Sequence, residues 1–461
     1  MLQADLNSQS QKPQLLKFFL VLVIELELWV KWHLGTGCSL SNRKCPGPLS
    51  HGFDYFYGLP FTLCNDMGIE ASFFVFDLQD SFYQALLVTF LVTFLPLALR
   101  KQTSLTLFIG LLLLILICFT WFIYTHFRFH TKKWWQVSPW MTQNFDGVVM
   151  RNHEVIHRRI PFDTLFDEIV NESVEFIHSS VREGKPFFLY HSFTHVHIPL
   201  FPSVKFRGRS AHGRYGDCIE ELDSGVGIIM KALQENHIDE DTIVYFASDH
   251  GGYIEAYDPV DGQRVGGYNK EFKGGKAMGA AEGAIRVPGI FRWKGTLSPE
   301  STLNLPTSQL DLLPTFIDLA DIQLNETISP KYEIDGISFA SFLKEPNKPL
   351  RTERVLLHHC GKEIHALRLI RDTKVYKMYL FRYKWEPGTH HCGVGLEKHC
   401  SCYGEKVLNI SESPILFELL SDPFEDYPID TKSQEYKNIV SKLQLYLKDY
   451  KEKESISSFK V

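Results

Sequence analysis

The stretch that decides the fold is Thr242-Ile-Val-Tyr-Phe-Ala-Ser-Asp249-His250-Gly-Gly252. Its first part is apolar almost throughout, which is typical of a strand buried on both faces of a sheet. An Asp-His pair and two glycines follow directly, where an α/β protein collects its chemistry beyond the carboxyl end of a strand. The preceding residues 215–234 carry apolar side chains at helical spacing. The sequence therefore predicts a helix followed by a buried strand.

The same alternation extends upstream of this stretch. Residues 162–182 predict a helix that ends near Gly184, and Phe187-Phe-Leu-Tyr190 predicts a short buried strand. Helices that alternate with buried strands predict an α/β fold, with a mostly parallel sheet covered by helices on both faces. His197 and Asp249 each follow such a strand, so we expect both at the functional edge of the sheet.

The pattern of apolar and polar residues changes towards the C-terminus of the chain. Residues 296–345 predict connecting helices and loops, including a helix after Asp311-Leu-Leu with Pro314 as its first residue. From about Arg354 the chain consists of short β-like runs, turns and cysteines, and a helix over 438–450 closes it. We therefore predict a smaller α+β domain over residues 351–461.

Composition indicates a folded protein of the secretory pathway. The 461 residues are 44% hydrophobic and 22% charged, and the net charge of −6 gives no reason to expect nucleic acid as a partner. The nine cysteines lack paired Cys-x-x-Cys spacing, which favours disulfides over zinc sites. Sequons at Asn171, Asn325 and Asn409 agree with glycosylation in a lumenal compartment.

Two apolar segments predict a transmembrane helical hairpin over residues 82–124. Phe82–Leu99 and Leu105–Tyr124 are long enough to cross the hydrocarbon core, which needs about 20 apolar residues. A short basic turn separates them, and basic turns favour the cytosolic side. Both flanks would then face the lumen of the endoplasmic reticulum or of a later secretory or lysosomal compartment, with membrane lipid as a partner. A pair of buried core helices is the alternative, although Leu111–Ile117 is apolar on every helical face.

Residues 1–30 are an atypical N-terminal apolar segment. Lys12 and Lys17 lie before and at the start of its apolar run, as in a signal peptide, but no small-residue cleavage site follows. Glu25 and Glu27 interrupt the apolar run, and its alternation suits a strand nearly as well. A signal segment and a buried strand are both compatible with the sequence.

Several short motifs combine groups suited to an anion and a neighbouring hard cation. They are Lys31-Trp-His33, His195-Val-His197, Ser248-Asp249-His250 and Lys273-Gly-Gly-Lys276. On an extended segment the two histidines of the second motif would project to one face. Lysines attract anions, and a carboxylate is a preferred calcium ligand. Each motif alone also fits an ordinary surface or core position, so their joint occurrence carries the hypothesis.

In this order, the motifs resemble those of the sulfatase family. The resemblance runs from about Lys31 to the C-terminus and includes His51-Gly-Phe-Asp-Tyr-Phe-Tyr-Gly58, Glu282-Gly-Ala-Ile-Arg-Val-Pro288 and Leu416-Phe-Glu-Leu…Asp422-Pro-Phe-Glu425. With the hairpin, the chain is similar to the branch that contains steryl-sulfatase and the vertebrate arylsulfatases. This implies an alkaline-phosphatase-like α/β domain over residues 31–81 and 126–350, a bound calcium ion, and hydrolysis of sulfate monoesters.

The resemblance also implies roles for single residues. Lys31 and Lys276 would bind the oxygens of a small-molecule sulfate ester. His197 would bind the sulfate or protonate the leaving oxygen, and His33 would act as a base on the hydrated aldehyde nucleophile. Asp249 would coordinate calcium.

His250 occupies the adjoining metal-ligand position in this resemblance. Many relatives have Asn or Gln there, and calcium prefers oxygen ligands to an imidazole. The resemblance thus implies a metal site built from Asp249 and, at the next position, His250.

The sequence departs from the family upstream of Lys31. Sulfatases have an Asp-Asp pair and a Cys-x-Pro-Ser-Arg element there, whose cysteine becomes the formylglycine nucleophile, and neither occurs in these 461 residues. We therefore expect sulfate binding with absent or impaired turnover. The alternatives are a non-catalytic membrane glycoprotein or truncated isoform acting as a partner, and a metal-dependent phosphohydrolase of the same superfamily.

Overall fold

The chain forms two compact units in this computed structural model, one spanning Lys31–Pro161 and the other combining Leu2–Val30 with Phe162–Val461. The structure describes residues 18–24, 48–60, 148–157, 160–257, 265–322, 334–350, 353–371, 373–386, 389–392, 400–402 and 406–457. Within these ranges no helix combines the length and the hydropathy needed to cross a membrane. The predicted hairpin over 82–124 lies outside them.

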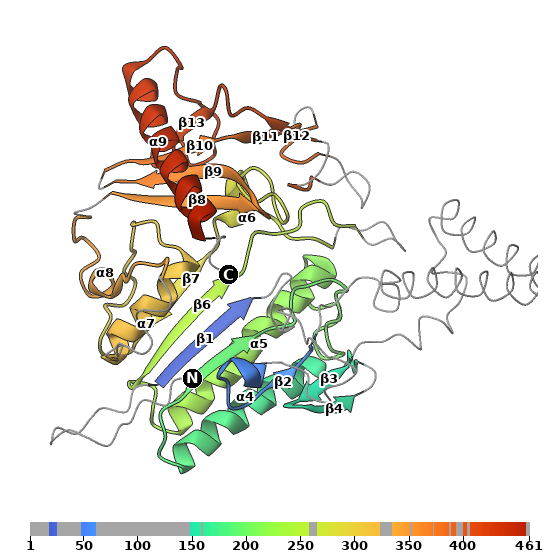
Figure 1. The fold of residues 1–461 in the computed structure, drawn as a ribbon. Coiled ribbons are helices and arrows are strands. Elements are labelled where there is room, and N and C mark those ends of the chain that lie inside the picture. Colours follow the sequence, from blue (N-terminus) through green and yellow to red (C-terminus); the bar gives the residue numbers. More distant parts are fainter. Residues whose placement is uncertain are drawn as a thin grey trace, which may run out of the picture. The chain divides into compact units, whose positions relative to one another are not determined.

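The main sheet has the strand order β5-β1-β6-β7 (Figure 1). Its strands are β1 (Phe18–Ile24), β5 (Phe188–Ser192), β6 (Thr242–Ser248) and β7 (Gly289–Arg292). β1 pairs in parallel with both β5 and β6, and β7 pairs antiparallel with β6. The prediction of a mostly parallel sheet is confirmed. The apolar N-terminal segment forms a strand, as its strand interpretation predicted, and this strand lies between β5 and β6.

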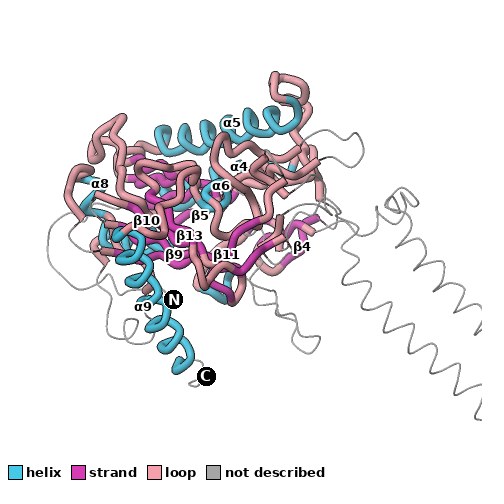
Figure 2. Tube along the Cα trace, turned by 90° about the horizontal axis from the view of Figure 1, so that it is seen from above, coloured by secondary structure: helices cyan, strands magenta, loops and turns pink. Residues whose placement is uncertain are grey.

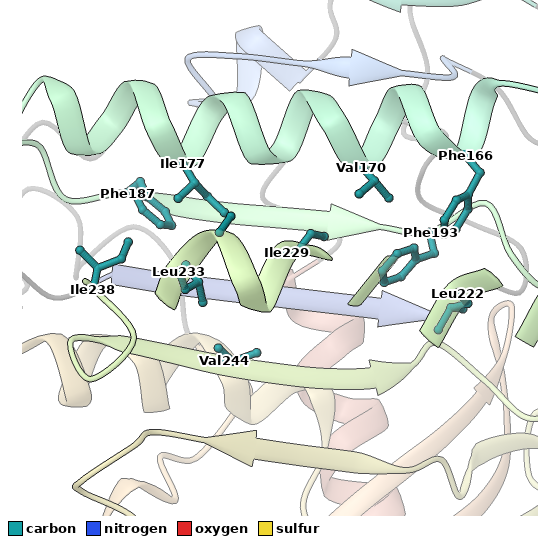
Figure 3. Close-up of a cluster of buried hydrophobic side chains, with 11 residues drawn as sticks. Phe166, Val170, Ile177, Phe187, Phe193, Leu222, Ile229, Leu233, Ile238 and Val244 are labelled. Carbon is teal, nitrogen blue, oxygen red and sulfur yellow. The ribbon is translucent and has the colours of Figure 1, made fainter. Parts of the chain in front are cut away.

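Helices α4 (Leu165–Arg182) and α5 (Gly213–Glu235) cover one face of this sheet (Figure 3). Both were predicted from the spacing of their apolar residues, and that spacing forms the core between helices and strands. The cluster includes Phe166, Val170, Ile177, Phe187, Phe193, Leu222, Ile229, Leu233, Ile238 and Val244. Each such side chain stabilises the fold by about 1.5–3 kcal/mol when fully buried.

Helix α7 (Leu312–Ala320) covers the opposite face, where Phe316 packs with Tyr245 of β6 and Phe291 of β7. The helix begins two residues earlier than predicted, so Pro314 is its third residue. A 3-10 turn, η3 (Gln309–Asp311), leads into it with a Ser308–Asp311 capping box. Pro314 is tolerated because the first-turn N–H groups have no intrahelical acceptor.

Asp311 has a structural role. Its carboxylate is fully buried and receives two hydrogen bonds from Arg354, of 2.6 and 2.5 Å. It also accepts the backbone N–H of Ser308 and of Ile337. The Asp311-Leu-Leu-Pro314 motif therefore joins α7 to the first strand of the C-terminal region.

The C-terminal residues build a separate antiparallel sheet with the order β13-β10-β9-β8. Its strands are β8 (Arg354–Cys360), β9 (Glu363–Ile370), β10 (Val375–Tyr379) and β13 (Ile415–Glu418). Helix α9 (Gln434–Ser457) lies against it, with Tyr436, Ile439, Val440 and Leu443 at helical spacing in the shared core (Figure 2).

Smaller elements complete the described chain. They are η1 (Pro48–His51), β2 (Tyr57–Gly58), β3 (Val149–Arg151), β4 (Glu154–His157), α6 (Glu282–Ile285), α8 (Ala340–Lys344), β11 (Phe381–Tyr383) and β12 (Val407–Asn409). Disulfides Cys360–Cys402 and Cys392–Cys400 confirm the preference for disulfides over zinc. Cys218 of α5 is a buried free thiol, so the disulfide prediction does not hold for it.

Candidate active site

Most of the predicted site residues that the structure describes lie where β5 and β6 end. Ser192 and Ser248, the last residues of these strands, lie opposite neighbouring residues Val23 and Ile24 of the shared strand β1. The strands are parallel, so the segments that follow them leave the same edge of the sheet. One segment carries His195 and His197, and the other carries Asp249 and His250. Lys31 and His33 lie outside the described residues.

Lys276 and His197 contact each other at this edge. The Lys276 Nζ lies 3.3 Å from His197 Nε2, although the residues are 79 positions apart in the sequence. Both are buried, with 6% and 2% of their surface exposed. The Nδ1 of His197 lies 2.5 Å from the carbonyl oxygen of Ile198, which requires a proton on Nδ1 and leaves Nε2 to accept from the ammonium. The Tyr253 ring lies 5.4 Å from the same ammonium.

His195 has a different environment, so the prediction that both histidines share a face was wrong. Its Nε2 lies 2.8 Å from Glu221 Oε2, and its ring stacks on Phe166. Glu221, on α5, also accepts the backbone N–H of Ser203. Burial raises the pKa of Glu221, but the hydrogen bonds from His195 and Ser203 outweigh burial and hold it below the usual value. The segment is a loop, so its side chains do not alternate as they would in a strand. His195 holds this loop against α5 through its contact with Glu221.

Asp249 and His250 offer two adjacent ligand atoms. Asp249 Oδ1 accepts the backbone N–H of His250 at 2.7 Å, and Oδ2 lies 3.4 Å from His250 Nε2. His250 Nδ1 lies 2.8 Å from the carbonyl oxygen of Gly251, so a proton there leaves a lone pair on Nε2. Two ligands at about 2.4 Å from a calcium ion, at right angles, would be about 3.4 Å apart. The spacing fits a divalent cation, although an imidazole suits transition metals better than calcium.

Glycine backbones pack the two site loops against each other. Lys276 donates its N–H to Gly252 O at 3.2 Å, and Gly251 donates to Ala284 O at 2.8 Å. A Cβ at Gly251 would lie 1.6 Å from the carbonyl oxygen of Gly283. The loop that holds Lys276 and the loop that holds Asp249 are therefore in direct backbone contact, which only glycine permits here.

Asn269 joins the same two loops. Its side chain accepts the N–H of Gly252 at 2.9 Å and donates to the carbonyls of Gly252 and Gly274. Asn269, Tyr253 and Glu221 were not predicted from the sequence. Each is a single residue outside any motif, so no spacing marks it.

Glu255, Cys392 and Cys400 also lie close enough to hold a metal ion, within 4.8 Å of one another. The two cysteines form a disulfide, however, and the carboxylate accepts the N–H of both at 2.9 and 2.7 Å. Burial raises the pKa of Glu255 to about 7 against the effect of these hydrogen bonds. This cluster is a structural link between the loop after β6 and the disulfide segment.

Comparisons with known proteins agree with this geometry. The sulfatase family model matches residues 122–322, and that of the C-terminal region of aryl-sulfatase matches residues 351–458. Human arylsulfatase H is 34% identical over 435 residues, covering 91% of this chain and 72% of that protein. Human arylsulfatase D and steryl-sulfatase are 34% and 33% identical, and the chain spans 65% and 66% of their lengths.

A solved structure shows that the fold is shared. The PsFucS1 sulfatase from Pseudoalteromonas sp. matches with a TM-score of 0.61 at 22% identity, covering 95% of this chain and 71% of that one. This likeness confirms the predicted alkaline-phosphatase-like α/β domain with a C-terminal domain. Together with the family models and the human relatives, it shows that the chain belongs to the sulfatase family and is of the arylsulfatase and steryl-sulfatase type.

Proposed function

We propose that this chain carries the sulfate-ester site of an arylsulfatase-type hydrolase. The observation that carries the proposal is the buried contact between Lys276 and His197 at the carboxyl edge of the sheet. A buried ammonium stabilises the negative charge on sulfate oxygens far better than an exposed one, because little water screens it. With Nδ1 held by the carbonyl oxygen of Ile198, the His197 Nε2 can bind the same oxyanion or protonate the leaving oxygen only when it carries a proton itself, with the ammonium of Lys276 turned to the sulfate oxygens. Lys31 and His33 lie outside the described residues, and their proposed roles as sulfate-binding group and base rest on the family resemblance alone.

The proposed metal site consists of Asp249 with His250 beside it. The 3.4 Å between their ligand atoms supports a shared divalent cation, and the carboxylate supports calcium. Bound there, calcium would supply Lewis-acid stabilisation of charge on the sulfuryl oxygens. Asp249 holds its own loop by accepting the N–H of His250, so its second oxygen has a fixed direction.

We further propose that a polypeptide of these 461 residues binds sulfate esters without turning them over. It contains no Cys-x-Pro-Ser-Arg sequence, so it lacks the residue that sulfatases convert to their nucleophile. Binding groups alone lower the energy of the bound ester but provide no covalent route to its hydrolysis.

The proposed setting is the lumenal face of a membrane in the secretory pathway. The hairpin over 82–124 would anchor an α/β domain of residues 31–81 and 126–350 and a C-terminal domain of residues 351–461. The sequons and the two disulfides support an oxidising lumen.

The test is calorimetric binding of 4-nitrophenyl sulfate to the purified chain with calcium, together with an assay for released sulfate. We expect binding without sulfate release, and a loss of about 10- to 100-fold in affinity for Lys276→Ala, since a charge-assisted hydrogen bond contributes about 1.5–3 kcal/mol. Lys231→Ala is the matched control, because Lys231 is an exposed lysine on α5. Turnover that Lys276→Ala abolishes would contradict the proposed inactivity, and tighter binding of 4-nitrophenyl phosphate would favour the phosphohydrolase alternative.

A further inference from the structure

A fully buried lysine lies in the C-terminal sheet, where β10 faces the loop of Lys276. Lys377 has no exposed surface, and its Nζ lies 2.8 Å from Glu282 Oε1 and 3.0 Å from Glu425 Oε1. Arg368 of β9 also pairs with Glu282. Burial raises the pKa of Glu282, but Lys377 and Arg368 lower it by more, so this carboxylate stays ionised. Lys377, Arg368 and the two carboxylates form a buried network, and the half-exposed Arg286 lies 3.8 Å from Glu282 at its edge.

This network holds the loop that carries Lys276. Glu282 is the first residue of α6, and its N–H lies 3.4 Å from Glu425 Oε2. At the other end of the loop, Lys273 Nζ donates to the carbonyl oxygen of Glu425 at 2.5 Å and to Asp426 at 2.8 Å. Both ends of the loop are therefore fixed by the segment around Glu425.

Further bonds from the C-terminal sheet reach the middle of the loop. The hydroxyl of Tyr379, on β10, lies 2.9 Å from the carbonyl oxygen of Ala280 and 2.6 Å from Glu425 Oε1. Gly283, next to Glu282, donates its N–H to Lys273 O at 2.8 Å and closes the loop on itself. The ammonium of Lys276 projects from this closed loop to His197.

Stability alone does not account for such a network. A buried ion pair costs desolvation energy that its attraction barely offsets, and well-packed apolar residues often replace one without loss. The charges do fix the positions of these side chains, because each buried carboxylate must stay paired with its cation.

We propose that Lys377 is a positioning residue that fixes the ammonium of Lys276 against His197, acting through Glu282 and Glu425. The inference rests on the proposed function, since it assumes that Lys276 binds the sulfate. The C-terminal region is then part of the sulfate site although none of these C-terminal side chains touches the ester.

The test compares Lys377→Met and Lys377→Arg, each alone and combined with Lys276→Ala, for binding of 4-nitrophenyl sulfate well below the thermal midpoint. We expect Lys377→Met to weaken binding about tenfold, which is about 1.4 kcal/mol, and Lys377→Arg to restore most of it. In the Lys276→Ala background, Lys377→Met should lower the affinity less than about twofold, because the effects of substitutions at coupled residues do not add. Lys374→Met is the control, since Lys374, directly before the same strand, forms an exposed ion pair with Glu435.

The outcomes separate the two proposals. If the unchanged chain binds no sulfate ester, the proposed function fails and this inference falls with it. If the unchanged chain binds and folded Lys377→Met binds equally well, only the positioning role is overturned. The same holds if Lys377→Met lowers the affinity by the same factor with and without Lys276→Ala. If Lys377→Met does not fold, Glu425→Gln replaces it, because a glutamine keeps an acceptor for Tyr379 and removes one charge of the network. Unchanged binding by Glu425→Gln would then overturn the role.

Discussion

His191 lies at the end of β5 with its ring enclosed in the core. Its Nδ1 lies 2.6 Å from Ser173 Oγ, and its ring packs edge-on against Phe193. Burial lowers the pKa of His191 to about 3. The ring is therefore neutral in the folded chain at neutral and mildly acidic pH. Charging it requires unfolding of this part of the core.

His191 should make folding stability fall in mild acid. The unfolded chain takes up this proton below about pH 6.5 and the folded chain does not, so stability is full above pH 6.5 and falls by about 1.4 kcal/mol per pH unit below it. Between pH 7.5 and 5.5 the thermal midpoint should drop about 1–2 °C more for the unchanged chain than for His191→Gln, since a chain of 461 residues has a large entropy of unfolding. His212→Gln, at an exposed position, should behave like the unchanged chain. Equal drops for all three would refute the assignment.

Single residues were predictable where they belong to a short motif, and most of these motifs follow the end of a strand. Lys276, His197, Asp249 and His250 each belong to a short pattern, and the structure brings the first two together and the last two together. Lys377 gave no signal, because a lysine within an apolar strand is marked only by the carboxylates that reach it from distant segments. Pairing of this kind is a tertiary property that no local spacing encodes.

At the scale of elements, the contact between the two site loops should tolerate no side chain. In Gly251→Ala the new Cβ would lie 1.6 Å from the backbone oxygen of Gly283, which cannot move aside as a flexible side chain would. We expect a loss of about 1–3 kcal/mol in the free energy of unfolding and at least about tenfold weaker binding of 4-nitrophenyl sulfate.

The matched control is Gly227→Ala on α5. Nothing lies within 4 Å of a Cβ built there, and alanine favours a helix by about 0.5–1 kcal/mol over glycine. This variant should keep its affinity and melt at the same or a slightly higher temperature. If both alanine variants bind alike, the loops are not held as tightly as their backbone contacts indicate.

Elements with strong periodicity were predicted closely, and their ends less well. The strand over residues 242–248 and the helices α4 and α5 follow directly from their apolar spacing. Helix α9 runs from Gln434 to Ser457, well beyond the predicted 438–450. Its outer turns are polar, so hydrophobic spacing did not mark them. The place of β1 in the sheet depends on its neighbours and was beyond local reasoning.

At the scale of the whole molecule, the hairpin predicted over residues 82–124 would attach the chain to a membrane. If residues 82–124 form a hairpin, the expressed chain should stay with the membrane pellet after alkaline carbonate extraction, since about 20 apolar residues per helix hold it in the bilayer. Deletion of 82–124 should release the chain into the supernatant. A protease added to intact microsomes should leave both flanks uncut. If alkaline carbonate released the unchanged chain into the supernatant, the hairpin prediction would be contradicted.

Strand β1 has a consequence for how the protein is made. Phe18 pairs with Thr242 and Phe19 with Phe188, so this early strand acquires its neighbours only after most of the α/β region has been synthesised. Until then the run Phe18-Phe-Leu-Val-Leu-Val-Ile24 has two unsatisfied backbone edges and a composition prone to self-association. Non-local pairing of this kind slows folding. The nascent chain should therefore depend on chaperones that shield residues 18–24 until their partner strands have been synthesised.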